Sequence, residues 1–143
     1  MDSGTFKQIE IILQEYPKYE DYIKKREEEL LNPYTPQDTN IGGGKSNRTS
    51  DTTAVKAITL ADDRILQRIK FQYWAVKNTY NQADDITQEI IREYYFKQPR
   101  TKTWDGIALQ VHTSKRSCFR IRKAFFSRLA SYLNLQNCLS HSG

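Results

Sequence analysis

The stretch TKTWDGIALQVHTSKRSCFRIRKAFFSRLASYL (residues 101–133) decides the fold. Its apolar residues recur at three- and four-residue spacing, which predicts helices rather than strands. A short helix fits Trp104–Gln110, with Thr103 as its N-cap and a turn at Val111–His112. A long helix follows the turn, and a short helix, a tight turn and a long helix are the parts of a helix-turn-helix. We therefore predict a helix-turn-helix over residues 103–133.

The long helix has two faces of opposite character. It is expected to begin after a cap at Thr113 or Ser114 and to reach about Leu133. At about 100° per residue, three cations and a hydroxyl lie within about 60° of one another: Arg116, Arg120, Lys123 and Ser127. The opposite side is apolar and comprises Cys118, Ile121, Phe125, Leu129 and Tyr132. Near it, Phe119 and Phe126 widen the sector that is expected to be buried.

A helix of this kind suits duplex DNA, because an α-helix fits the major groove and its first residues meet base edges. We predict that Lys115, Arg116 and Arg120 contact bases or lie near them. A guanidinium can pair with guanine through two hydrogen bonds.

Phosphate contacts are predicted for residues on either side of the turn. Lys123 lies further along the helix, and Arg100 and Lys102 precede the short helix. Thr113 and Ser114 can offer hydroxyls and helix-terminal amides to a phosphate. The predicted DNA-binding set is Arg100, Lys102, Thr113, Ser114, Lys115, Arg116, Arg120, Lys123 and Ser127.

The distribution of charge supports a polyanionic partner. The formal net charge of the 143 residues is +5, and residues 99–143 hold eight Lys/Arg against Asp105 as the single acid. Such a segment suits nucleic acid or an anionic membrane surface. No apolar run approaches the ~18 residues of a membrane span, and the start of the chain lacks the pattern of a signal peptide. We therefore expect a cytoplasmic protein that binds no membrane.

The rest of the chain is also expected to be helical, and the fold class is all-α. Residues 1–31 predict a helical hairpin broken near Pro17, and residues 32–51 form a Gly/Pro-rich linker by composition. Residues 52–135 predict a helical domain that carries the helix-turn-helix, and residues 136–143 form a tail. The spare apolar surface of the hairpin makes a homodimer an open expectation.

Two capping boxes and two pairs of acids mark predicted helix starts. Thr5 with Gln8 and Asp85 with Gln88 match the capping-box pattern. The pairs Asp62/Asp63 and Asp84/Asp85 precede helices, where carboxylates favour the positive end of the dipole. Capping is therefore a better interpretation of these acids than acid/base catalysis.

No enzymatic site is predicted. Gly44-Lys45-Ser46 lacks the glycine that a phosphate loop needs five positions earlier, where Thr39 stands. The histidines His112 and His141 and the cysteines do not converge on a metal set. We accordingly expect no catalytic residue, no metal and no cofactor.

Two resemblances sharpen these expectations. The sequence EIIREYYFK (89–97) together with residues 103–133 resembles the region of sigma factors that reads the promoter −35 element. More specifically, residues 6 to 135 resemble phage late-gene regulators of the RinA/ArpU type from phages of Gram-positive bacteria. The matching pieces are EYP near Tyr16, KREEEL, NPYTPQDTNIGGGKSN, REYYF and the helix-turn-helix.

The second resemblance implies a sequence-specific activator without enzymatic activity, which binds double-stranded DNA upstream of late packaging and morphogenesis genes in a bacterial host. RNA polymerase would then be a further partner, through the N-terminal half. Two alternatives stay open from the residues. One is a DNA-packaging protein similar to a terminase small subunit, and the other is an adaptor whose basic helix meets an acidic protein.

Overall fold

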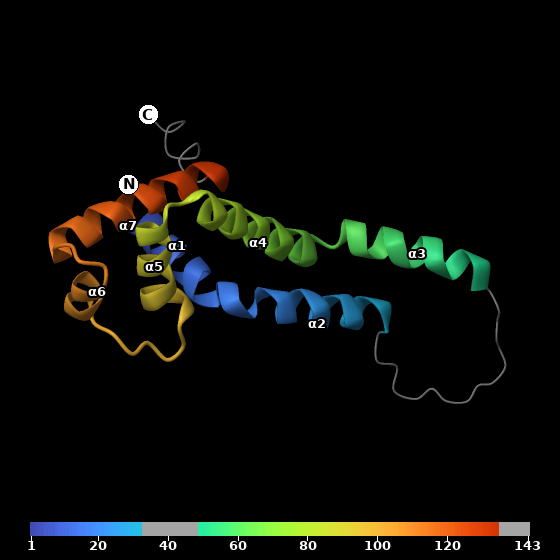
Figure 1. The fold of residues 1–143 in the computed structure, drawn as a ribbon. Helices are drawn as coiled ribbons and strands as arrows, with labels where there is room; N and C mark the ends of the chain where they lie inside the picture. Colours follow the sequence, from blue (N-terminus) through green and yellow to red (C-terminus); the bar gives the residue numbers. More distant parts are fainter. Residues whose placement is uncertain (33–48, 135–143) are drawn as a thin grey trace. The chain divides into compact units, whose positions relative to one another are not determined.

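The computed structural model describes residues 1–32 and 49–134, with side chains from residue 53 in the second range. The regular elements of these residues are all helical, with no strand (Figure 1). The all-α prediction is therefore confirmed. The elements are α1 (Ser3–Glu15), a 3₁₀ turn η1 (Tyr16–Lys18), α2 (Tyr19–Leu31), α3 (Thr49–Asp62), α4 (Arg64–Gln82), α5 (Asp85–Ile91), a π-helical turn η2 (Arg92–Phe96), α6 (Trp104–Gln110) and α7 (Lys115–Tyr132).

Packing groups the chain into two compact units. Among the described residues, the first unit, which we call the α7 unit, holds residues 1–18 and 72–134, and the second, the α2–α3 unit, holds residues 19–32 and 49–71. Helix α4 begins in the α2–α3 unit and ends in the α7 unit. The domain boundaries predicted from the sequence stay a prediction.

The core of the α7 unit is built by α1, α5, η2 and α7. Helix α1 packs against η2 and α7, and α5 packs against α7. The largest fully buried side chains come from all of these elements and include Ile9, Leu13, Ile90, Ile91, Tyr95, Phe125, Phe126 and Leu129. Burying aromatic and branched aliphatic side chains stabilises a fold by about 1.5–3 kcal/mol each. This core fixes the position of α7.

The α2–α3 unit is stabilised by an ion pair as well as by the packing of α2 against α3. The guanidinium of Arg26 on α2 donates hydrogen bonds to both carboxylate oxygens of Asp63, at 3.0 and 2.8 Å. Asp63 also accepts from the backbone N–H of Leu66 at 2.7 Å and so caps the start of α4, as the acid pair predicted. The hydrogen bonds from Arg26 and Leu66 lower the pKa of Asp63 below its ordinary value.

Several details of the sequence interpretation are corrected. The cap of α1 is Asp2, which accepts from the N–H of Thr5 at 2.7 Å, so Thr5 lies inside the helix and not at its cap. The cap of α5 is Asp84 rather than Asp85, with the N–H of Thr87 at 2.9 Å. In both cases the residue that caps the helix precedes the predicted one in the sequence. Its carboxylate accepts a hydrogen bond from the backbone N–H of the third residue after it.

Three exposed side chains correct the predicted faces. The apolar periodicity of α4 predicts that Ile65 and Val76 share a buried face, and Val76 is fully buried whereas Ile65 is half exposed. On α7, Phe119 was expected in the buried sector but is 36% exposed. On α7, Tyr132 is 42% exposed, and its hydroxyl accepts a hydrogen bond from Asn78 at 2.7 Å. A tyrosine side chain can bury part of its ring while its hydroxyl stays accessible to solvent, so it can lie at the border of an apolar face.

Other predictions fall partly or wholly outside the described residues. The linker 32–51 overlaps them only at residue 32 and at residues 49–51, which belong to α3, and Gly44-Lys45-Ser46 lies outside. The tail 136–143 with His141 also lies outside. Within residues 1–32 and 49–134, no helix is both long and apolar enough to cross a bilayer.

Candidate nucleic-acid interface

The connection between α6 and α7 is a tight turn closed by backbone hydrogen bonds. Thr103 caps α6 by accepting from the N–H of Gly106 at 3.2 Å. The N–H of Thr113 then donates to the carbonyl of Ala108 at 3.0 Å. Between them His112 adopts a left-handed conformation, with φ of 59°. Glycine often supplies that conformation in such turns, and here histidine adopts it.

Helix α7 begins at a serine cap. The hydroxyl of Ser114 accepts from the N–H of Ser117 at 3.0 Å, which settles the choice between Thr113 and Ser114 in favour of Ser114. The Ser114 hydroxyl also donates to that of Ser117 at 3.1 Å. Ser114 is therefore occupied in starting the helix, and its side chain orders the first turn of α7.

A small apolar cluster holds α6 against α7. Its buried members are Ile90, Ile107, Ala108, Val111 and Cys118, and Tyr94, Trp104 and Ile121 pack around them. Ala108 is 7% exposed and belongs to the cluster that α6 and α7 share. Burial raises the pKa of the Cys118 thiol, and this thiol is part of the packing.

The basic residues predicted on the outer face of α7 are solvent-exposed. Lys115, Arg116, Arg120 and Lys123 are exposed, whereas Thr113 and Ser127 are half-buried. The buried positions of the same helix are Cys118, Phe125, Phe126, Leu129 and Ala130. We refer to Arg116, Arg120, Lys123 and Ser127 as the outer face of α7.

Local contacts restrain some of these cations only weakly. A terminal nitrogen of Arg120 donates to the hydroxyl of Ser117 at 3.1 Å. The ammonium of Lys115 lies 3.4 Å from the carboxylate of Asp105, whose side chain is 80% exposed. Ion pairs that open to water contribute little free energy. These cations can therefore exchange their present partners for an anionic ligand at small cost.

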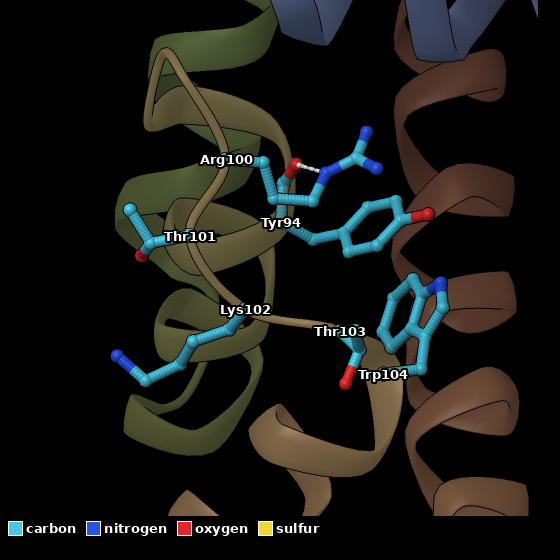
Figure 2. A pocket seen from close by; sticks show the side chains of 6 residues that line it. All are labelled: Tyr94, Arg100, Thr101, Lys102, Thr103 and Trp104. Carbon is cyan, nitrogen blue, oxygen red and sulfur yellow. Dashed lines mark hydrogen bonds between the residues drawn. The ribbon is translucent and has the colours of Figure 1, made fainter.

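Arg100 and Lys102 lie apart from α7, on the loop that precedes α6 (Figure 2). The guanidinium carbon of Arg100 lies 3.8 Å from the centre of the Tyr94 ring, and its Nε donates to the Tyr94 carbonyl at 3.1 Å. The ammonium of Lys102 lies 3.4 Å from the buried carboxylate of Glu93. The structure therefore places the predicted residues on two elements, the outer face of α7 and this loop.

Glu93 restrains Lys102 together with a second cation. Burial disfavours the charged form of Glu93, but the hydrogen bonds from Lys97 and Lys102 outweigh this effect, so its pKa lies below the ordinary value. The ammonium of Lys97 is 3.0 Å from Glu93. Much of the charge of Lys102 is thus neutralised by the protein itself.

Arg122 and Arg128 are the two basic residues of the segment to which the sequence interpretation assigned no DNA contact, and Arg122 has a distinct environment. Its side chain is 17% exposed, and its guanidinium carbon lies 4.8 Å from the ring centres of Phe6 and Trp104 and 5.0 Å from that of Phe119. A signal was available, because Arg122 falls on the same side of the helical wheel as Phe119 and Phe126. Arg122 therefore belongs to the interior.

Catalytic and metal sites were not expected. Within the described parts of the chain, no group of His, Cys, Asp or Glu side chains is arranged to hold a metal ion. The paired acids act at helix starts, as the hydrogen bonds of Asp63 and Asp84 show. What the arrangement offers chemically is a row of exposed cations on a helix that follows a tight turn.

Comparison with known proteins identifies the family of this chain. Residues 6–131 match the family described as "Protein of unknown function (DUF722)", so the chain belongs to this family. The chain is also similar to "Transcriptional activator rinA" of Staphylococcus phage phi11, with 31% identity over 131 residues that cover 91% of each protein. The resemblance to RinA-type proteins is thereby confirmed. No solved structure matches the chain.

Proposed function

We propose that this protein is a phage transcriptional activator that binds double-stranded DNA with sequence specificity and switches on late packaging and morphogenesis genes. The observation that carries the proposal is the exposed outer face of α7, which follows a short helix and a tight turn and lies opposite a buried apolar face. The similarity to a protein named as a transcriptional activator supports the regulatory role. The protein would act in the bacterial host cytoplasm without catalysing a reaction.

The proposed readout assigns separate tasks to the basic residues. Lys115, Arg116 and Arg120, in the first turns of α7, would reach base edges in the major groove. Lys123 and the loop residues Arg100 and Lys102 would meet phosphates, which position the helix without reading sequence. The hydroxyls of Thr113 and Ser127 would supply additional contacts to the DNA backbone, and Ser114, whose hydroxyl caps α7, would supply its backbone N–H.

Selection from a pool of random duplexes by the full chain tests the proposal. We expect one sequence to be enriched, and binding to it to be saturable and to weaken steeply as salt rises, because bound phosphates release counterions. Measurement of the molar mass decides the role: a monomer or dimer supports regulation, whereas a ring of many subunits would indicate a packaging protein. Absence of selective DNA retention at physiological salt would contradict the proposal and favour an adaptor of acidic proteins.

Two partners complete the proposal. Activation requires contact with the host RNA polymerase, which we assign to the N-terminal half and which co-purification with the polymerase tests. We also propose a homodimer in which α3 packs against a second copy of the chain. Its residues Val55 and Ile58 are 58% and 60% exposed, and a helix with apolar residues on its outward side is usually covered by another surface.

A further inference from the structure

A hollow of about 370 Å³ opens beside the loop that precedes α6 (Figure 2). It is lined by Tyr94, Arg100, Thr101, Lys102, Thr103 and Trp104. In Figure 2 the Arg100 guanidinium and the two aromatic rings lie on the same side, whereas the Lys102 side chain points away from them. No carboxylate lines it, so the hollow suits an anion.

Arg100 is held in a defined position by the ring of Tyr94. The guanidinium stacks on the ring at 3.8 Å, and the Nε is fixed by the Tyr94 carbonyl. Figure 2 shows the two terminal nitrogens of the guanidinium pointing away from this hydrogen bond. A guanidinium fixed in this way presents its terminal N–H groups to a ligand with little further loss of side-chain freedom.

The aromatic rings are already stacked on each other. The ring centres of Tyr94 and Trp104 lie 4.1 Å apart with an interplanar angle of 26°. Because Arg100 and Trp104 both stack on Tyr94, its ring cannot also stack on a nucleic-acid base. The rings therefore serve as a rigid support for Arg100, and the ligand is expected to be a phosphate.

The two cations of the hollow are not equivalent. Lys102 shares the buried carboxylate of Glu93 with Lys97, whereas the guanidinium of Arg100 is held by a ring and a carbonyl, neither of which neutralises it. An incoming phosphate therefore gains more from Arg100 than from Lys102.

We propose that this hollow is a preformed seat for a backbone phosphate of duplex DNA, with Arg100 as the contact and Tyr94 as its positioning residue. This inference rests on the proposed DNA-binding function and adds Tyr94 to it. Thr101 and Thr103 supply hydroxyls at the rim. Because a phosphate carries no base identity, the seat contributes equally on every sequence.

The test measures binding of the full chain to a short duplex of mixed sequence at several salt concentrations. Arg100→Ala is expected to lower affinity about 5–10-fold and to reduce the slope of log K against log salt by about 1. Lys102→Ala is expected to change the slope less. Arg68→Ala, at an exposed arginine of the α2–α3 unit, is the charge-matched control and should leave both values near those of the wild type.

Two further variants separate positioning from charge. Arg100→Lys and Tyr94→Leu keep the net charge, so we expect the salt slope to be retained while affinity falls about 3-fold, since the cation is no longer held. Tyr94→Phe keeps the stacked ring and should bind like the wild type. Thermal unfolding checks that each variant is folded. If Tyr94→Leu does not fold, Arg100→Lys alone tests whether the position of the cation matters.

The outcomes distinguish the seat from the function on which it rests. If Arg100→Ala binds with unchanged affinity and slope while Arg116→Ala binds more weakly, the seat is wrong and the DNA-binding function stands. If Tyr94→Leu and Arg100→Lys both bind like the wild type, Tyr94 has no positioning role and the seat is wrong. If the wild-type chain retains no duplex, both proposals are wrong.

Discussion

Arg122 donates a hydrogen bond from Nη1 to the hydroxyl of Tyr95 across 3.2 Å, although Arg122 stands in the most basic part of the chain. The Tyr95 hydroxyl in turn donates to a carboxylate oxygen of Glu10 on α1 at 2.7 Å. Burial and the hydrogen bond to Glu10 raise the pKa of Tyr95 above its ordinary value. One arginine of α7 thus links α1, η2 and α7 from within.

Replacement of Arg122 should therefore affect stability. The Nη1 of Arg122 also lies 3.8 Å from the Glu10 carboxylate. We expect Arg122→Ala to reduce the free energy of unfolding by about 2–3 kcal/mol, because it removes the contacts with four aromatic rings and this ion pair. Urea denaturation measures the change. The matched control is Arg120→Ala, whose exposed side chain should contribute within about 0.5 kcal/mol. Equal losses for the two variants would contradict an interior role for Arg122.

For the outer face of α7 we predict the reverse of Arg122: replacing its residues should affect DNA binding rather than stability. We expect Arg116→Ala and Arg120→Ala each to weaken binding to the selected sequence by about 1–3 kcal/mol and to relax its preference. Lys123→Ala should weaken binding to all sequences to a similar extent. Competition between selected and mixed duplexes measures both effects. Unchanged binding by both arginine variants would disprove the recognition-helix assignment.

Local sequence patterns were sufficient for the helices and for the two faces of α7. Periodicity placed α6 and α7, and the helical wheel placed Arg116, Arg120 and Lys123 on the exposed side. These features depend on neighbours three or four residues apart, so the sequence reports them directly. The caps were displaced by one to three residues, since several adjacent polar side chains satisfy the same pattern.

Contacts between distant residues were not predictable in this way. Tyr95 and Glu10 are separated by 85 positions, and Arg26 and Asp63 by 37. A cation–ring stack such as that of Arg100 on Tyr94 also depends on the path of a loop, which periodicity does not describe. The sequence analysis therefore assigned DNA contacts to Arg100 and Arg120 and none to Arg122, without the ring, carbonyl and hydroxyl partners of Arg100 and Arg122.

The turn between α6 and α7 offers a test of backbone strain. His112 adopts a φ of 59°, which costs an L-residue about 1 kcal/mol relative to glycine. We expect His112→Gly to raise the free energy of unfolding by about 0.5–1 kcal/mol and His112→Val to lower it, because β-branched residues tolerate this region least. DNA binding by His112→Gly should be unchanged. A lower stability of His112→Gly would show that the imidazole makes a contact that outweighs the strain.

Acid should destabilise the protein in part through Glu93. Its folded-state pKa lies below the ordinary value of 4.5, so its contribution to stability is complete above that pH and is lost as the pH falls through the folded-state pKa. We expect Glu93→Gln to be less stable than the wild type at neutral pH and to lose less stability on acidification below about 4.5. Thermal unfolding across this pH range measures both effects. Parallel pH profiles of the two proteins would show that the ion pairs with Lys97 and Lys102 contribute nothing.

The proposed homodimer gives the last prediction, at the exposed apolar side of α3. Ile58→Asp places a charge where we expect a second copy to pack, and a buried unpaired charge is strongly unfavourable, so the variant should be monomeric. Lys56→Asp is the control, because Lys56 is exposed on the side of the helix away from Ile58 and should leave the dimer intact. Sedimentation equilibrium of the full chain gives the mass of each variant.

Since a dimeric helix-turn-helix protein binds two half-sites, the monomeric variant should also lose most of its affinity for a selected sequence with two repeats and retain binding to one repeat. A wild-type chain that is monomeric at all concentrations, or an Ile58→Asp variant that remains dimeric, would contradict this interface without affecting the assignment of α7.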